Sequence, residues 1–429
     1  MIKNRVIKNA SWIIACRVVQ SILSFLIGML TARYLGPANY GLINYASSVV
    51  AFVTPIMYLG LNAVLVQEII NNPSEEGKLL GTSIGMSLCS AVLCIIGVVA
   101  FTIISNPGEI DTLVIVTLYS LILVFQSIDL LQYWFQAKLM SKYTSIAMLV
   151  AYLFVSAYKT FLLITNKSLY WFAVSNSVDY VMVALLLLFF YRHFGKQPFT
   201  FSFSLCKRLL SRSKYYIISN LMVVIFTQTD KIMLKLMISD VETGLYSAAV
   251  TCAGITSFVF SAIIDSSRPS IFENRKNSIK NFENSISTLY CVVIYLALAQ
   301  CLLMTILAKP IISIMYGNNY LAAIPVLQVA VWYTTFSYIG PVRGVWMLAE
   351  EKQKYLLIIN IIGATSNVVM NYILIKPYGM LGAAIASIVT QLFTNVVIGY
   401  IIPQLRRNNE LMLYGLNPKY IIKIVKEMI

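Results

Sequence analysis

The sequence predicts an all-α integral membrane protein with twelve transmembrane helices in two six-helix lobes. Composition is the first observation behind this class: 59% of the 429 residues are hydrophobic and only 11% are charged, whereas an ordinary soluble domain carries roughly 25% charged residues. Twelve long apolar segments are the second, and the distribution of Lys and Arg between them is the third. So few charges cannot cover a surface that faces water, which excludes a soluble enzyme, a disordered protein and a secreted disulfide scaffold.

Twelve segments are long enough to cross a membrane, since a spanning helix needs about 20 mainly apolar residues. They lie at 10–30, 42–65, 81–104, 113–135, 144–164, 171–191, 216–238, 245–267, 287–308, 322–347, 355–375 and 381–402. The first segment follows residues 1–9, contains Arg17 and Gln20, and lacks a small-residue cleavage site. We therefore expect it to be a retained span rather than a signal peptide.

The Lys and Arg residues between the segments indicate the orientation. With the N-terminus in the cytoplasm, the inside segments hold 23 of the 32 Lys and Arg residues and the outside loops hold 4. Cytoplasmic loops carry such an excess, so the sequence predicts a multi-pass protein of the bacterial inner (cytoplasmic) membrane with both termini in the cytoplasm. The basic segment 192–215 fits this signal, with some attraction to anionic membrane lipids, and we expect no nucleic-acid partner.

The same basic segment divides the chain into two halves of six spans. The predicted parts are an N-terminal lobe at 1–191, a basic cytoplasmic linker loop at 192–215, a C-terminal lobe at 216–402 and a cytoplasmic tail at 403–429. A shift of 203 residues places Tyr40-Gly41-Leu42 on Thr243-Gly244-Leu245. Such a duplication predicts a pseudo-two-fold axis along the membrane normal and a substrate cavity between the lobes, lined by the first, second, seventh and eighth spans.

Polar residues follow one face of several spans. At 100° per residue, one stripe of the second span contains Asn44, Ser48, Ala51, Pro55, Tyr58 and Asn62. In the fourth span, one face carries Gln126, Asp129, Tyr133 and Gln136. Close helix packing is one explanation for stripes of small residues. An ionisable group within a span instead faces the bundle interior or water, because contact with lipid is costly.

The sequence holds little that would support catalysis or metal binding. Its single histidine is His193, and no phosphate-binding G-x-x-x-x-G-K-[ST] motif occurs. Six of the seven cysteines lie inside apolar runs, and none forms a C-x-x-C pair. We therefore expect no catalytic residue, no metal and no cofactor, and a transporter rather than an enzyme.

Several short motifs resemble those of a known family. They are Lys8-Asn9 with Trp12, Ala32-Arg33-Tyr34-Leu35-Gly36-Pro37 with Tyr40-Gly41, Gly60-Leu61, Asp230-Lys231, Gly244-Leu245-Tyr246, and Tyr316-Gly317 with Tyr320. Together with the topology, they look like the Wzx-type O-antigen flippases of polysaccharide biosynthesis. The resemblance covers nearly the whole chain, with Thr243 as a departure, and implies the MATE-like fold of the multidrug, oligosaccharidyl-lipid and polysaccharide exporter superfamily.

The resemblance implies a function in the biosynthesis of lipopolysaccharide or a related surface polysaccharide. The substrate would be an oligosaccharide unit linked through pyrophosphate to undecaprenol, moved from the cytoplasmic to the periplasmic leaflet by alternating access. A glycan polymerase and a chain-length regulator are the implied partner proteins. The physics agrees, because each polar group of a sugar costs several kcal/mol when it is stripped of water in hydrocarbon. A path then needs hydroxyl- and amide-bearing walls for the sugar and a cation for the diphosphate.

The candidate site residues follow from these requirements. The substrate-binding candidates of the cavity are Arg17, Gln20, Ser24, Arg33, Asn62, Asn220, Lys231, Asp265, Arg268 and Arg343. The candidates for a coupling ion or a counter-charge are Asp129, Asp179 and Asp230. Arg17 and Lys231 are expected to attract the diphosphate, and Arg33 is taken over from the family's R-Y-L-G pattern. Snorkelling to the headgroups and structural ion pairing are the alternative roles of these charges.

Three other functions stay open. A drug or cation antiporter of the same fold generally places an acid in the first span, whereas this span carries Arg17 and no Asp or Glu. A membrane-embedded glycan polymerase or ligase needs large outer loops with reactive groups, and the longest predicted outer loop, 309–321, has no acid or His. A peptidoglycan-precursor flippase resembles the chain more closely but usually has two further spans.

Overall fold

The structure is a computed structural model that describes residues 2–417, with side chains described for residue 16 and for residues 18–417. Within this part of the chain every regular element is a helix. The chain divides into two compact units, Met1–Gln228 and Thr229–Ile429, and the division falls inside the long helix α9 (Phe203–Met237). The predicted boundary lies earlier, in segment 192–215, and the predicted bounds of the four parts stay a prediction.

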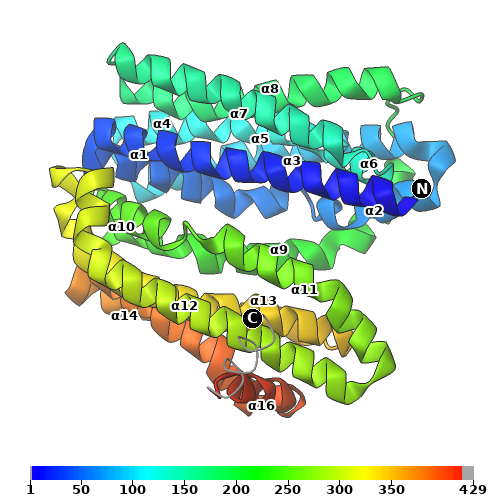
Figure 1. Ribbon diagram of the computed structural model, residues 1–429. Helices are drawn as coiled ribbons and strands as arrows, with labels where there is room; N and C mark the ends of the chain where they lie inside the picture. Colours follow the sequence, from blue (N-terminus) through cyan, green and yellow to red (C-terminus); the bar gives the residue numbers. More distant parts are fainter. Residues whose placement is uncertain (1, 418–429) are drawn as a thin grey trace. The chain divides into compact units, whose positions relative to one another are not determined.

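The first unit is a bundle in which α7 packs against both α1 and α8, and these helices run side by side in Figure 1. Its elements before α9 are α1 (Ile2–Met57), α2 (Leu61–Asn71), η1 (Pro73–Glu75), α3 (Glu76–Ser105), α4 (Ile110–Ser120), α5 (Ile122–Gln126), η2 (Ile128–Leu130), α6 (Leu131–Ala137), α7 (Ser141–Ile164) and α8 (Leu169–Phe194).

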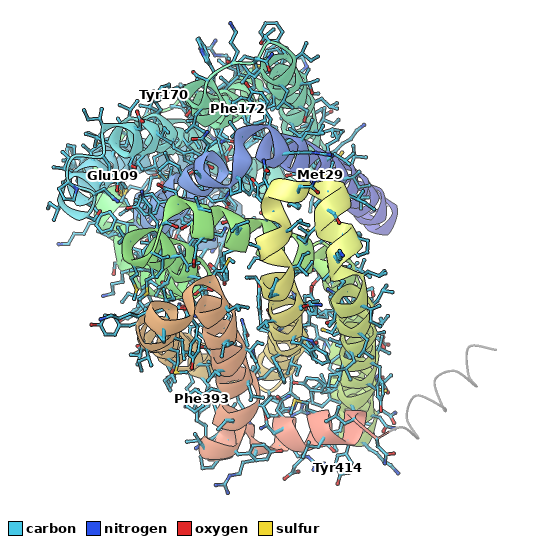
Figure 2. The ribbon with its side chains drawn as sticks, turned by 90° about the vertical axis from the view of Figure 1, so that its left-hand side faces the viewer. Met29, Glu109, Tyr170, Phe172, Phe393 and Tyr414 are labelled. Carbon is cyan, nitrogen blue, oxygen red and sulfur yellow. The ribbon has the colours of Figure 1, made fainter. Side chains whose placement is uncertain are left out.

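The second unit is organised around α12 and α13, which pack along each other. Its elements after α9 are α10 (Asp240–Ala253), α11 (Ser257–Asn277), α12 (Ile279–Met315), η3 (Asn318–Ala323), α13 (Ile324–Ala349), α14 (Lys354–Leu392), η4 (Phe393–Val397), α15 (Ile398–Ile401), η5 (Pro403–Leu405) and α16 (Arg406–Gly415). In Figure 2, α16 carries the label Tyr414 and lies across the ends of the longer helices of this unit.

Nine helices of the described part are long and apolar enough to cross a membrane, or ten when the bent pair α10 and α11 counts as one span. Two of the nine are about twice the length of one crossing: Val18–Asn71 has 54 residues and Lys354–Ile401 has 48. A single crossing takes about 20 residues. The predicted all-helical membrane class is thus confirmed, while the predicted number of twelve crossings depends on how the two long helices are divided.

A glycine interrupts the helical backbone inside each of the two double-length helices. Gly36 in α1 has φ 74° and ψ 170°, and Gly379 in α14 has φ 55° and ψ −136°. A helix needs φ and ψ near −60° and −45°, and glycine adopts positive φ because it has no Cβ. At Gly379 a Cβ would also lie 2.4 Å from an Oε atom of Glu242. Both glycines lie between two predicted spans.

The predicted fourth span, 113–135, is broken into α4, α5, η2 and α6 rather than forming one helix. Hydroxyl side chains explain part of this irregularity. Thr117 Oγ1 donates to the carbonyl of Leu113 at 2.7 Å, and Ser127 Oγ donates to that of Leu123 at 3.1 Å. Such bonds back to the preceding turn compete with the backbone ladder and bend helices. The irregular stretch places Asp129 on the 3₁₀ turn η2.

The predicted linker loop 192–215 is helical from Phe203 onwards, where α9 begins. Its basic residues explain why it is held to the first unit. Glu68 near the end of α2 is only 1% exposed, and it pairs with Arg208 at 3.2 Å and with Arg212. A buried carboxylate needs such partners, because an unpaired charge away from water is costly. The second half of the predicted linker segment is therefore helical.

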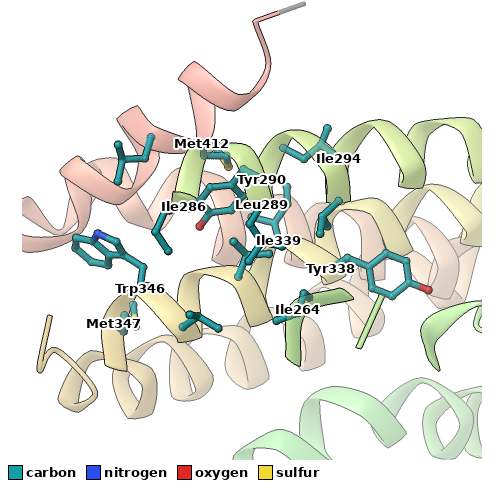
Figure 3. Close-up of a cluster of buried hydrophobic side chains, with 14 of the residues drawn as sticks. Ile264, Ile286, Leu289, Tyr290, Ile294, Tyr338, Ile339, Trp346, Met347 and Met412 are labelled. Atoms are coloured by element: carbon teal, nitrogen blue, oxygen red, sulfur yellow. The ribbon is translucent and has the colours of Figure 1, made fainter. Parts of the chain in front are cut away.

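Each unit has its own apolar core. In the first unit it is formed by side chains of α2, α3, α6, α7, α8 and α9, among them Leu61, Leu130, Phe135 and Leu187. In the second unit Figure 3 shows Tyr290, Ile339 and Met412 at the meeting point of α12, α13 and α16. The phenol of Tyr290 donates to Asn408 Oδ1 of α16 at 2.9 Å, so the terminal helix is an integral part of that core.

Candidate functional site

The first unit contains a cavity of about 510 Å³ whose wall combines apolar and polar side chains. Helices α1, α2, α4, α5, α8 and α9 contribute to its wall, which consists of Ser47, Val50, Ala51, Thr54, Pro55, Tyr58, Asn62, Tyr119, Ile122, Gln126, Tyr180, Asn220, Val223 and Val224. Eight of these side chains carry a hydroxyl or an amide. A cavity of this size, mainly apolar with a few convergent polar groups, is typical of a small-molecule site.

The predicted stripe of the second span forms one wall of this cavity. Ala51, Pro55, Tyr58 and Asn62 line it, whereas Ser48 is buried and donates to Gln228 Oε1 at 3.0 Å. Ala51 and Pro55 share a face of α1 through the 100° periodicity. Tyr58 and Asn62 lie beyond its end, because Leu59 and Gly60 have positive φ and Asn62 belongs to α2. Pro55 has no N–H to donate to the preceding turn, and it lies within α1 at the level of the cavity.

Two amide oxygens of the cavity wall have no hydrogen-bond donor in the described part of the chain. They are Asn62 Oδ1 and Gln126 Oε1, and both atoms are buried. A buried polar atom without a partner costs roughly 1–3 kcal/mol, so native structures rarely keep one without a reason. Asn62 and Asn220, both predicted as substrate-binding residues, lie in the wall of the same cavity.

Two carboxylates lie beside the cavity. Asp129 on η2 is 6% exposed, and Asp179 on α8 is partly buried. Each has one buried oxygen without a hydrogen bond among the described residues, and the two groups repel each other electrostatically. Lys159 on α7 attracts Asp179 and donates to Asn176 Oδ1 at 3.0 Å. The two aspartates that the sequence predicts as coupling-ion or counter-charge residues therefore flank one side of the cavity, next to Tyr58 and Tyr180.

The second unit contains a carboxylate in a quite different environment. Asp230 of α9 is 6% exposed and accepts hydrogen bonds from Asn371 Nδ2 at 2.6 Å, from Ser387 Oγ at 2.7 Å and from the phenol of Tyr246. Asn371 also donates to Asn367 Oδ1 at 3.0 Å. Helices α9, α10 and α14 are thus tied together by one negative charge, which three neutral donors stabilise.

The charged candidates of the second unit differ in their relation to this cluster. Lys231 follows Asp230 in α9, is partly buried and is attracted electrostatically by that carboxylate, but it forms no hydrogen bond or close ion pair among the described residues. Arg343 is 2% exposed and donates to the carbonyl of Thr394 at 2.7 Å and to Asn395 Oδ1 at 3.0 Å. Both acceptors lie on η4, a turn of π-helix, so this guanidinium holds an irregular backbone segment inside the protein.

The remaining candidates lie nearer the surface of their units or outside the described side chains. Asp265 and Arg268 are exposed and pair with each other at 3.2 Å on α11. Ser24 and Arg33 are exposed on α1, and Gln20 lines a second, smaller cavity of the first unit. The side chain of Arg17 lies outside the described residues. Its predicted contact with a diphosphate stays a prediction.

Sequence reasoning did not identify the cavity tyrosines Tyr119 and Tyr180. Both interact electrostatically with Asp179. Tyr180 follows this aspartate directly in the sequence, and it also interacts with Asp129. An aromatic hydroxyl next to an intramembrane acid was the available signal. Tyr119 had none, because a lone tyrosine in an apolar span is common.

The chain is similar to proteins of polysaccharide biosynthesis. A model of the family described as polysaccharide biosynthesis protein matches residues 6–275. The capsular polysaccharide biosynthesis protein CapF of Staphylococcus aureus is 20% identical over 395 residues, which cover 90% of this chain and 96% of CapF. The match covers nearly the full length of both proteins.

Two solved membrane proteins share the fold. The lipid II flippase MurJ, in an inward closed conformation, superposes with a TM-score of 0.69 at 14% identity, covering 96% of this chain and 92% of that chain. An inward-facing multidrug resistance transporter of the MATE family superposes with a TM-score of 0.65 at 13% identity, covering 91% and 94%. The fold is therefore MATE-like, as predicted, and neither family nor fold is that of an enzyme. The chain belongs to the polysaccharide biosynthesis protein family.

Proposed function

We propose that this protein is a flippase that moves undecaprenyl-pyrophosphate-linked oligosaccharide units from the cytoplasmic to the periplasmic leaflet, for O-antigen or a related surface polysaccharide. The observation that carries the proposal is the 510 Å³ cavity, whose hydroxyl and amide walls lie inside apolar helices. Sugar hydroxyls need such walls, because hydrocarbon offers them no hydrogen bond. The names of CapF, a capsular polysaccharide biosynthesis protein, and of MurJ, a lipid II flippase, support the same direction.

The proposed topology is twelve crossings in a bacterial inner membrane, with both termini in the cytoplasm. Counting α1 and α14 as two crossings each, divided at Gly36 and Gly379, supports the number twelve. The bent pair α10 and α11 then serves as one crossing. The bias of Lys and Arg towards alternate connections supports the orientation.

We assign the parts of the substrate to different groups. Asn62, Gln126 and Asn220 offer amides to the sugar hydroxyls, and the unpartnered oxygens of Asn62 and Gln126 support this role. Arg17 and Lys231 attract the diphosphate, and the lack of an ion pair at Lys231 among the described residues supports its part. Alternating access then releases the head in the outer leaflet.

The acidic groups are proposed to act as a coupling-ion site or as counter-charges. Asp129 and Asp179 each have a buried oxygen that no described donor satisfies, which leaves room for a proton or a small cation. Asp230 is saturated with neutral donors and is better suited to a permanent counter-charge in the unit that carries Lys231.

The test is a complementation experiment in a bacterium that makes the native glycan and lacks this gene. Asn62→Ala and Asn220→Ala should each lower surface polysaccharide at least tenfold and accumulate lipid-linked units on the cytoplasmic side. Asn39→Ala is the matched control, because Asn39 is exposed and does not line the cavity. Normal surface polysaccharide in both cavity variants, at equal protein levels in the membrane, would contradict the proposal.

A drug or cation antiporter is the second candidate, and one observation favours it. The cavity combines Tyr58 and Tyr180 with the nearby Asp129 and Asp179, and aromatic faces with carboxylates attract organic cations. Drug resistance on overexpression, lost in Asp129→Asn and without any effect of the deletion on surface glycan, would select this candidate instead.

A further inference from the structure

The first unit contains a second cavity, of about 190 Å³, between the first part of α1, α6 and the start of α7. Six of its eight lining side chains are polar and uncharged, namely Gln20, Gln132, Gln136, Ser141, Thr144 and Ser145. The connection between α6 and α7 follows directly, at the end of the bundle that the Lys and Arg distribution predicts to be cytoplasmic.

One hydroxyl of this cavity is buried without a partner in the described part of the chain. Thr144 is 7% exposed, and its Oγ1 accepts and donates no hydrogen bond there. The amides of Gln20, Gln132 and Gln136 form no hydrogen bond with described residues either, but Gln136 is exposed and the other two are partly buried, so water can reach them. Because a buried hydroxyl normally finds a bond, Thr144 is the group of this wall that a ligand would satisfy.

Glutamines elsewhere in the helices show the contrast. Gln300 Nε2 donates to the carbonyl of Ala253 at 3.1 Å, and Gln328 Nε2 donates to that of Thr305 at 3.2 Å. Those two side chains join neighbouring helices of the second unit. Among the described residues, the glutamines of the small cavity form no such bond between helices.

The described residues of the wall indicate what kind of ligand it would bind. Among them there is no Asp, Glu, Lys or Arg, and their neutral amides and hydroxyls pair with neutral hydroxyl groups. An amide presents a donor and an acceptor side by side, which matches a pair of neighbouring hydroxyls. The volume equals about six waters at roughly 30 Å³ each, which is enough for one sugar ring and too small for an oligosaccharide.

We propose that this cavity is a subsite for a single uncharged sugar residue, held by the amides of Gln20, Gln132 and Gln136 and by the hydroxyl of Thr144. The inference rests on the proposed function, because it assigns one ring of the transported oligosaccharide to this place. Its position near the predicted cytoplasmic end suits a first contact of the sugar head before it enters the larger cavity.

Ligand-detected saturation-transfer NMR on the purified full chain tests the subsite. The probes are the methyl glycosides of glucose, galactose and N-acetylglucosamine at millimolar concentration. At least one should give a signal in the wild type, and Gln20→Ala and Gln132→Ala should each reduce it at least fivefold. Gln328→Ala is the matched control, because that amide is satisfied by a backbone carbonyl, and its signal should equal that of the wild type.

Two results would overturn the subsite. One is the absence of a signal with every glycoside, which would mean that the cavity holds only water. The other is a signal that is unchanged in both glutamine variants. Complementation separates this failure from failure of the proposed function. If the wild-type protein restores surface polysaccharide but binds no glycoside, only the proposed subsite is rejected. If the protein binds a glycoside but deletion of its gene leaves surface polysaccharide intact, only the proposed flippase function is rejected.

Discussion

Two groups of buried polar side chains, one in each unit, are in opposite situations. In the first unit, Asn62, Gln126 and Asp129 line or flank a cavity and keep oxygens without described partners. In the second unit, Asp230 has three donors from two other helices. A fully hydrogen-bonded buried group contributes to stability, whereas a buried oxygen without a partner costs free energy until a ligand or water satisfies it. The comparison therefore predicts that replacing Asp230 costs stability and that replacing Asn62 costs transport.

The largest effect on stability is expected from Asp230→Ala. The change leaves the donors of Asn371, Ser387 and Tyr246 buried without an acceptor, at roughly 1–3 kcal/mol each, so the loss should reach about 3 kcal/mol or more. Thermal unfolding of the purified protein in detergent measures it. Asp265→Ala, on an exposed part of α11, is the control. An unchanged midpoint in Asp230→Ala would refute the structural part of the comparison.

Gly379→Ala should come next. The residue has φ 55°, and a Cβ would meet Glu242 at 2.4 Å, so backbone strain and contact together should cost about 1–3 kcal/mol. Gly344→Ala serves as the control, since a Cβ there has no atom within 4 Å. Both variants are compared by thermal unfolding, and equal midpoints would show that the turn inside α14 is not built as described.

Asn62→Ala should separate transport from stability. The change removes an oxygen without a donor together with the hydrogen bond between the amide and Tyr133, so the free energy of unfolding should change by no more than about 1 kcal/mol. Transport should fall at least tenfold, which corresponds to about 1.4 kcal/mol. Unfolding midpoint and surface polysaccharide are measured on the same variant. A destabilised Asn62→Ala protein with normal transport would contradict the role in transport that is assigned to Asn62.

The smallest effect is expected at the pair of Asp265 and Arg268. The two side chains are exposed, lie three residues apart on α11 and pair at 3.2 Å. An exposed pair contributes roughly 0–1 kcal/mol and is screened by salt. Arg268→Ala should therefore shift the unfolding midpoint by little, and less at high salt. A clear loss of transport in this variant would support the substrate contact that the sequence predicts for Arg268.

Helical spacing accounts for part of one wall of the larger cavity. Ala51 and Pro55 lie four residues apart on α1 and face the cavity because such side chains share a helix face, whereas Tyr58 and Asn62 reach it across the turn after Met57. The breaks of the fourth span escaped prediction, because they depend on hydroxyl bonds to single carbonyls. The helical start of α9 escaped it because the partner of its arginines, Glu68, lies about 140 residues earlier.

The amino-acid sequence by itself determined that this protein is helical and lies in a membrane, because hydropathy and periodicity are properties of neighbouring residues. It also determined where two long helices break, since Gly36 and Gly379 stand between apolar segments. Only the tertiary structure decided which polar side chains are satisfied. Asp230 accepts hydrogen bonds from Asn371 and Ser387, which lie about 140 and 160 residues later in the sequence. Gln20, Gln132 and Gln136 instead line one small cavity. Hydrogen bonding depends on atoms within about 3 Å, and the folded chain alone brings such distant atoms together.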